Sequence, residues 1–131
     1  MAHRFSIRVY YEDTDLAGIV YYANYLKFIE RGRSEWVRAL GVDQLRLKEE
    51  QGLVFAVRRV EADYLSPARY DDMLVVETVP EAVTGARVVL AQRVMRGDDV
   101  LFAARVTLAM LAASGAPVRL PADIRRSFGG G

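Results

Sequence analysis

The stretch that decides the fold is residues 11–33, YEDTDLAGIVYYANYLKFIERGR. It begins at the end of an alternating segment, passes through a loop that carries Asp13, Asp15 and Gly18, and leads directly into an aromatic-rich helical segment. Carboxylates in a loop beside a helix N-terminus lie next to free backbone N–H groups and the positive end of the helix dipole. No other stretch concentrates chemically active side chains in this way.

The composition narrows the class of protein. The chain has 131 residues, of which 52% are hydrophobic and 27% charged, as in a single globular domain spanning 1–131. A formal net charge of +1 gives no bulk attraction to nucleic acid or to an anionic membrane. No apolar run approaches the roughly 18 residues of a membrane span, and the N-terminus has no signal-peptide core. We expect a cytoplasmic protein without membrane insertion.

The sequence has few of the residues that a metal site or a histidine-dependent catalytic site requires. Cysteine is absent and His3 is the only histidine, which removes thiolate sites, a cysteine nucleophile and a histidine-based triad or metal site. The loop starting at Asp13 has some EF-hand spacing, but Ala17 and Asn24 stand where oxygen ligands are needed. A glycosyltransferase-type DxD would need a larger nucleotide-binding scaffold. We predict no metal and no cofactor.

Hydrophobic periodicity predicts an α+β fold. Alternation predicts a half-buried strand over 4–12, and a 3.6-residue period predicts a long helix over 22–40. Shorter helices are predicted over 43–51 and 121–127, strands over 53–65, 73–80, 86–96 and 100–112, and a disordered tail over 129–131. Short connections between the strands indicate antiparallel pairing, so we expect one five-stranded sheet with the long helix on its concave face. The apolar last strand should be central or covered on both sides, and leftover apolar surface indicates an oligomer.

One charged residue interrupts the apolar stripe of the long helix. The stripe is predicted to consist of Tyr25, Leu26, Ile29, Trp36, Val37 and Leu40. Arg33 falls inside it, and the ordinary explanation is a buried structural ion pair. A ligand or interface contact is the alternative. We assign Asp13 to structure, either orienting the loop or pairing with an arginine such as Arg33.

The motifs resemble those of a known family. Residues 10–15 (YYEDTD), 18–25 (GIVYYANY) and 30–33 (ERGR) closely resemble the signature of the hotdog-fold acyl-CoA thioesterases, nearest to the YbgC-like branch and more distantly to 4-hydroxybenzoyl-CoA thioesterase. The resemblance continues through 67–73 (PARYDDM) and Gln92-Arg93, and covers essentially the whole chain. It implies the hotdog fold, in which a five-stranded antiparallel sheet wraps around a long central helix.

The resemblance also implies an activity. It implies hydrolysis of an acyl-CoA with a short-chain or aromatic acyl group, with an acyl carrier protein as an alternative carrier. Asp15 would be the catalytic carboxylate, and the helix entered at Tyr22 would direct its backbone N–H at the thioester carbonyl. Family members form homodimers, often paired into homotetramers, with active sites at the dimer interface. Many YbgC-like members have histidine where this chain has Tyr22, so any role of that imidazole is not carried over.

The chemistry of thioester hydrolysis agrees with these residue types. A carboxylate in a partly desolvated loop serves as base or nucleophile, and free N–H groups at a helix N-terminus serve as an oxyanion hole. Gly18 allows a tight turn or close ligand approach. Val57 and Arg58 are candidates to run along the pantetheine arm. The candidates to bind the coenzyme A phosphates are Arg69 and Arg87, ahead of Arg59 and Arg119.

Two other functions are considered. A non-enzymatic interaction protein of the Tol–Pal envelope system or of lipid synthesis, with weak residual hydrolysis, is the alternative that the resemblance leaves open. A hotdog dehydratase would need a histidine in the site, and the chain has only His3.

Overall fold

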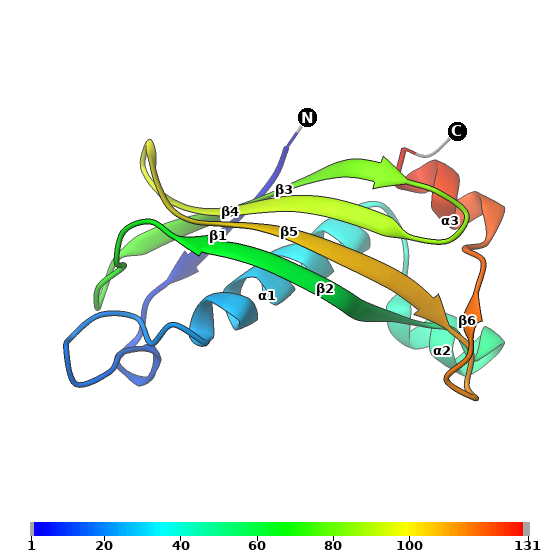
Figure 1. Cartoon of the computed structure of the whole chain (residues 1–131), viewed down its shortest axis with the longest axis horizontal. Coiled ribbons are helices and arrows are strands. Elements are labelled where there is room, and N and C mark those ends of the chain that lie inside the picture. Colours follow the sequence, from blue (N-terminus) through cyan, green and yellow to red (C-terminus); the bar gives the residue numbers. More distant parts are fainter. Residues whose placement is uncertain (1, 130–131) are drawn as a thin grey trace.

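The computed structural model describes residues 2–129, in which a helix lies along one face of an antiparallel sheet (Figure 1). The elements in chain order are β1 (His3–Arg8), the 3-10 turn η1 (Tyr11–Asp13), α1 (Asn24–Ala39), α2 (Gln44–Gln51), β2 (Val54–Tyr64), β3 (Met73–Val83), β4 (Val88–Arg96), β5 (Asp99–Leu111), β6 (Pro117–Val118) and α3 (Ala122–Ser127). Of the predicted disordered tail, 130 and 131 lie outside the described residues. Gly129 donates its N–H to the carbonyl of Arg126 at 3.0 Å.

The strands form one antiparallel sheet in the order β1-β3-β4-β5-β2. The apolar strand β5 lies between β4 and β2, so the prediction of a central last strand is confirmed. The two-residue β6 pairs with the end of β5 and adds a sixth strand to the five that were predicted. β1 and β2 form the edges, and most of β2 is exposed along its length.

α1 packs its apolar side against β1, β3 and β4. Its buried residues are Tyr25, Phe28, Ile29, Gly32, Trp36 and Val37. The predicted stripe is therefore right for four residues and wrong for Leu26 and Leu40, which are 42% and 37% exposed. Leu26 lies at the margin of the buried side, and Leu40 follows the last residue of the helix. The helix ends before Gly41, whose φ of +83° is the left-handed conformation that favours glycine there.

The arginine in this stripe has a different partner from the one predicted. Nη1 of Arg33 donates to Oε1 of Gln92 at 3.0 Å, and no carboxylate of residues 2–129 forms an ion pair with it. Gln92 is fully buried, and its amide donates to the carbonyl of Ile29 and to Oγ1 of Thr78, both at 2.9 Å. Burial lowers the pKa of Arg33, and the nearby Glu30 charge partly offsets this. The predicted ion pair is wrong.

The geometry of the sheet explains why the partner of Arg33 is an amide and not a carboxylate. Neighbouring side chains of a strand alternate between its faces, so Glu77 points away from α1 when Thr78 points toward it. On that outer face Glu77 is 7% exposed and is held by Arg4 and by Nε of Arg93 at 3.0 Å. The carboxylate of Glu77 is therefore paired on the face of the sheet that points away from α1, where Arg33 does not reach it.

Two strand boundaries differ from the predictions by more than two residues. The strand predicted over 4–12 ends at Arg8, because the N–H of Tyr10 donates to the carboxylate of Asp13 at 2.8 Å and a tight turn follows. β3 continues past Pro80 to Val83 through a bulge between Pro80 and Ala82. A bulge tolerates proline's missing N–H, so the sheet is not ended there.

Candidate active site

The loop between β1 and α1 folds back on itself. The N–H of Asp15 donates to the carbonyl of Ile19 at 2.9 Å, and the N–H of Gly18 donates to the carbonyl of Asp15 at 3.0 Å. Thr14 forms an antiparallel bridge with Val20. Gly18 has φ +80°, a conformation that other residues rarely adopt, so glycine is required for this turn. The turn brings Asp15 beside the residues that lead into the helix.

The carboxylate of Asp15 is only partly used by the protein. Its Oδ1 accepts a hydrogen bond from the N–H of Ala17 at 2.9 Å, which orients the side chain. Its Oδ2 has no hydrogen-bond partner among residues 2–129, and the residue is half-buried. One carboxylate oxygen is therefore held in place while the other is available to a ligand.

Asp13 joins the loop to the helix. Its carboxylate accepts from the N–H of Tyr10, while its carbonyl accepts from the N–H of Tyr21 at 2.9 Å and from the amide of Asn24 at 3.0 Å. Because Asn24 is the first residue of α1, these bonds set the direction in which the chain enters the helix. Of the two structural roles predicted for Asp13, the structure shows loop orientation and not pairing with Arg33.

The N-terminus of α1 carries free donors. Ala23 occupies the N-cap position, where a side chain that can accept a hydrogen bond is usual, and it provides none. In the part of the chain that the structure describes, neither the N–H of Tyr22 nor that of Ala23 donates a hydrogen bond. Such groups, at the positive end of the helix dipole, favour an oxygen that carries or develops negative charge.

The segment 65–72 forms the facing wall. Ala68 is fully buried, its carbonyl accepts from the N–H of Val20 at 2.9 Å, and its N–H donates to the hydroxyl of Tyr25 at 3.0 Å. The carboxylate of Asp72 accepts from Nη1 of Arg96 at 2.8 Å. This segment contains residues 67–72 of the PARYDDM motif (67–73), to which the sequence interpretation assigned no structural role.

The carboxylate of Asp72 holds the wall 65–72 in place by accepting from the backbone N–H of Arg69 and from the guanidinium of Arg96. Burial alone raises the pKa of Asp72, but hydrogen bonds from the Arg69 N–H (2.8 Å) and the Arg96 side chain outweigh it, and the net pKa is lowered. Asp72 therefore remains a carboxylate at neutral pH and keeps 65–72 in place.

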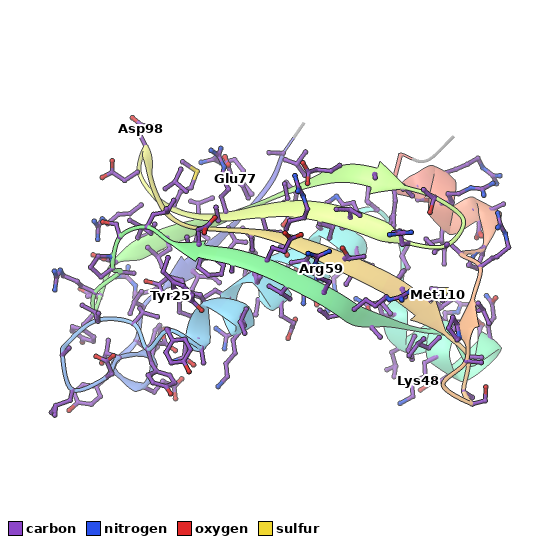
Figure 2. The ribbon with its side chains drawn as sticks, in the orientation of Figure 1. Tyr25, Lys48, Arg59, Glu77, Asp98 and Met110 are labelled. Atoms are coloured by element: carbon purple, nitrogen blue, oxygen red, sulfur yellow. The ribbon has the colours of Figure 1, made fainter. Side chains whose placement is uncertain are left out.

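A cavity of about 310 Å³ lies between the loop and this wall. It is lined by Ile19, Val20, Tyr22, Tyr25, Tyr64, Leu65, Ser66 and Pro67. Figure 2 places Tyr25 where the loop joins α1. The ring of Tyr64 lies 6.1 Å from that of Tyr22 and 5.6 Å from that of Tyr25. Larger hollows at the α1–α2 junction and on the outer sheet face, about 540 and 580 Å³, are not lined by the loop.

The other candidate residues are not all at this place. Arg69 forms a bridge with Ile19 and borders the cavity region. Val57 and Arg58 lie at a bulge in β2, six or seven residues before Tyr64, about 20 Å along a strand. Arg87 follows the β3–β4 turn, at the end of the sheet opposite the loop (Figure 1). Within one chain, backbone contacts join Asp15 and Arg69 to Ile19, and Tyr22 lines the same cavity as Ile19, although Asp15, Gly18 and Arg69 do not line it. Val57, Arg58 and Arg87 lie elsewhere.

Tyr64, Leu65 and Ser66 line the cavity but were missed as site residues. The only signal in the sequence was their position just before the Pro67 break, which marks the end of a strand without revealing what it faces.

Two negative findings concern residues 2–129. No group of three or more histidine or acidic side chains there is arranged to hold a metal ion. No helix in that range is both long enough and apolar enough to cross a membrane.

Comparisons with known proteins agree on one family. The family model described as Thioesterase superfamily matches residues 17–103. The chain is 43% identical over 125 residues to acyl-CoA thioesterase YbgC of Haemophilus influenzae, covering 95% of this chain and 92% of that protein. It is 41% identical over 98 residues to acyl-CoA thioester hydrolase YbgC of Escherichia coli, covering 75% and 72%. The crystal structure of a probable thioesterase from Bartonella henselae superposes with a TM-score of 0.89 at 40% identity, covering 92% of this chain and all of that one.

Proposed function

The chain belongs to the thioesterase superfamily, and from this premise we propose that it hydrolyses the thioester bond of acyl-CoA to a free acid and coenzyme A. The observation that carries the proposal is that the loop entering α1 holds both a carboxylate with one unbonded oxygen and unbonded backbone donors. Asp15 keeps Oδ2 available, and the N–H groups of Tyr22 and Ala23 have no partner among residues 2–129. Thioester hydrolysis needs these two groups, one to start the attack and one to receive charge on oxygen.

Two routes use the same residues. In the first, Asp15 removes a proton from a water molecule that attacks the carbonyl carbon; the tetrahedral intermediate then expels the thiolate, which takes the proton from Asp15. In the second, Asp15 attacks directly, the thiolate leaves, and water hydrolyses the mixed anhydride. In both, the N–H groups near Tyr22 stabilise the oxyanion, each such donor typically contributing about 10²–10³ in rate. Neither route needs a metal or redox cofactor.

The cavity beside the loop supports a small acyl group. Its volume of about 310 Å³ is at the lower end for ligand sites, and most of its lining is apolar or aromatic. We propose a short-chain or aromatic acyl group for this cavity, with Tyr22 beside the substrate. Tyr22 is 61% exposed, so its ring is free to contact the acyl group.

The exposed edge strand supports a homodimer. β2 leaves one row of backbone groups unpaired within the chain, which is a template for a second strand. Antiparallel pairing of two copies of β2 about a point between Val60 and Glu61 would place Val57 of one copy opposite Tyr64 of the other, with Arg58 beside it. We propose that the site is completed in this way in a homodimer or homotetramer.

The remaining proposals concern the carrier and the compartment. The proposed ligands of the coenzyme A phosphates are Arg69 and Arg87. Arg69 lies beside the cavity of its own chain, whereas Arg87 would have to come from another subunit of the oligomer. An acyl carrier protein is the alternative carrier. The absence of cysteine fits a reducing compartment and supports a cytoplasmic location.

Asp15→Asn tests the activity. Released thiol is measured for acetyl-, butyryl-, octanoyl-, palmitoyl- and benzoyl-CoA with the wild type, Asp15→Asn and the control Asp123→Asn. The amide oxygen of asparagine still accepts from Ala17, so the loop should keep its shape. We expect kcat to fall by about 10²–10⁴ in Asp15→Asn and to be unchanged in Asp123→Asn, which alters an exposed carboxylate on α3. Absence of turnover in the wild type, or full turnover in Asp15→Asn, would refute the proposal.

A further inference from the structure

A hydrogen bond from the end of β2 reaches the backbone at the entrance to α1. The hydroxyl of Tyr64 donates to the carbonyl oxygen of Tyr22 at 3.0 Å, across 42 positions of the chain. That carbonyl belongs to the peptide unit whose N–H is that of Ala23, one of the two unbonded donors. The reaction described above makes no use of Tyr64.

We propose that Tyr64 is a positioning residue that aims the Ala23 N–H at the thioester carbonyl, a role that rests on the proposed function. A trans peptide unit is planar, so its C=O and its N–H point in opposite directions. A hydrogen bond that fixes the carbonyl of Tyr22 therefore also fixes the direction of the Ala23 N–H. Accepting a hydrogen bond at the carbonyl polarises the peptide unit and makes its N–H a stronger donor.

The ring of Tyr64 is 49% exposed and packs against the core on its other side. Its ring lies 5.0 Å from the ring of Phe102 and 5.6 Å from that of Tyr25, both in edge-to-face geometry. These partners are buried, so the ring is held from the core side. Burial, followed by the neighbouring phenols of Tyr22 and Tyr25, raises the pKa of Tyr64, and the hydroxyl keeps its proton at neutral pH.

Among residues 2–129, Tyr64 is the one side chain that hydrogen-bonds to this peptide unit. The N-cap residue is Ala23, which has no side-chain acceptor to take up the first N–H groups of the helix. A capping side chain would accept from the N–H of the second or third helical residue, so it would not orient the peptide unit between Tyr22 and Ala23. Bonding the opposite side of the peptide unit orients a donor without consuming it, and Tyr64 does this.

The test is Tyr64→Phe, which keeps the ring and removes only the hydroxyl. We expect kcat for the best acyl-CoA to fall about tenfold while KM stays within about twofold, since the lost bond acts on the donor for the transition state. The matched control is Ser127→Ala on α3, which removes a hydroxyl that also donates to a backbone carbonyl at 3.0 Å, that of Asp123, away from the residues that line the cavity. This control should keep wild-type kcat.

Binding of two coenzyme A analogues separates positioning from a structural role. A trifluoromethyl ketone analogue, whose hydrate is tetrahedral, should bind Tyr64→Phe about tenfold more weakly than the wild type. A thioether analogue, which lacks the carbonyl, should bind both equally. An unchanged kcat in Tyr64→Phe, or equal weakening of both analogues, would overturn this proposal while Asp15→Asn still abolished turnover. A wild type that hydrolyses no acyl-CoA would overturn this proposal together with the proposed function.

Discussion

The first turn of α1 and the middle of the same helix use polar groups in opposite ways. At the first turn, the N–H groups of Tyr22 and Ala23 and one oxygen of Asp15 have no partner within residues 2–129. In the middle, Arg33 and the buried Gln92 are bonded to each other, and Gln92 is bonded further to strand and helix. Groups without a hydrogen-bond partner are available to a substrate. Groups that are bonded to one another fix the helix to the sheet. Changes in the middle should therefore lower stability, and changes at the first turn should lower turnover.

The largest expected effect on stability comes from Gly32→Val. A Cβ at Gly32 would overlap the side chain of Val76, a stiff β-branched residue that is fully buried on β3. We expect the free energy of unfolding to fall by about 3 kcal/mol, because overpacking outweighs the helix propensity gained by replacing glycine. Urea denaturation measures this, and kcat per folded molecule should not change.

The double variant Gly32→Val with Val76→Ala is the control. Removing the two methyl groups of Val76 should restore at least half of the lost stability, because the two residues contact each other. If the double variant is less stable than the sum of the single changes, contact with Val76 is not the cause.

Gln92→Leu tests the polar junction. The change leaves the guanidinium of Arg33 and the hydroxyl of Thr78 without their partner, and we expect a loss of about 2 kcal/mol in unfolding free energy. The double variant with Arg33→Met should lose less, because it removes the desolvated charge as well as its partner. A double variant as unstable as Gln92→Leu alone would contradict this view.

Tyr25 lies between the two regions, so Tyr25→Phe tests whether one change can affect both stability and substrate binding. The phenylalanine ring can keep its stacking on Phe102 at 5.0 Å, but the buried N–H of Ala68 loses its acceptor. We expect about 1.5 kcal/mol of destabilisation together with a KM raised several-fold, since Ala68 anchors the wall of the cavity. Chemical denaturation and steady-state kinetics measure the two effects, and a stability loss with unchanged KM would separate that wall from substrate binding.

The smallest expected effect is pH-dependent and comes from Asp72→Asn. The folded-state pKa of Asp72 is lowered, so its carboxylate stabilises the protein above the unfolded pKa of about 3.9 and this contribution is lost as pH falls through the folded value. At pH 7 the variant should be about 1 kcal/mol less stable, because asparagine can still accept from the N–H of Arg69 but lacks the charge opposite Arg96.

Thermal unfolding of the wild type and Asp72→Asn from pH 7 to pH 2.5 measures this difference. The two proteins should converge in stability below about pH 3. A constant difference over the whole range would mean that the carboxylate charge is not what stabilises segment 65–72.

Much of the fold could be predicted from local patterns. The two helices end before Gly41 and Gly52, both with a left-handed φ, and Asp43 caps the second helix by accepting from the N–H of Arg46 at 3.1 Å. The end of the first strand could not be predicted this way, because alternation continues to Glu12. The carboxylate of Asp13 instead captures the N–H of Tyr10 and turns the chain.

The candidate site was predicted in part. Asp15 and Gly18 are next to the helix entrance in sequence, so a short loop suffices to bring them there. Arg87 was predicted from residue type alone and lies at the other end of the sheet in one chain. The facing wall and the contact from Tyr64 come from segments more than 40 residues away, and periodicity within a strand does not tell which loop its end will meet.

The sequence by itself determined the types of the elements and the loop that carries Asp15, because periodicity, caps and turns are encoded within a few residues. Only the tertiary structure decided that Arg33 is bonded to Gln92 and that Tyr64 is bonded to Tyr22, partners 59 and 42 positions apart. The order β1-β3-β4-β5-β2 sets both pairs, since it determines which strand faces α1 and which edge ends beside the loop. Strand order is a choice among long-range pairings whose free energies depend on the whole core, and no local pattern specifies it.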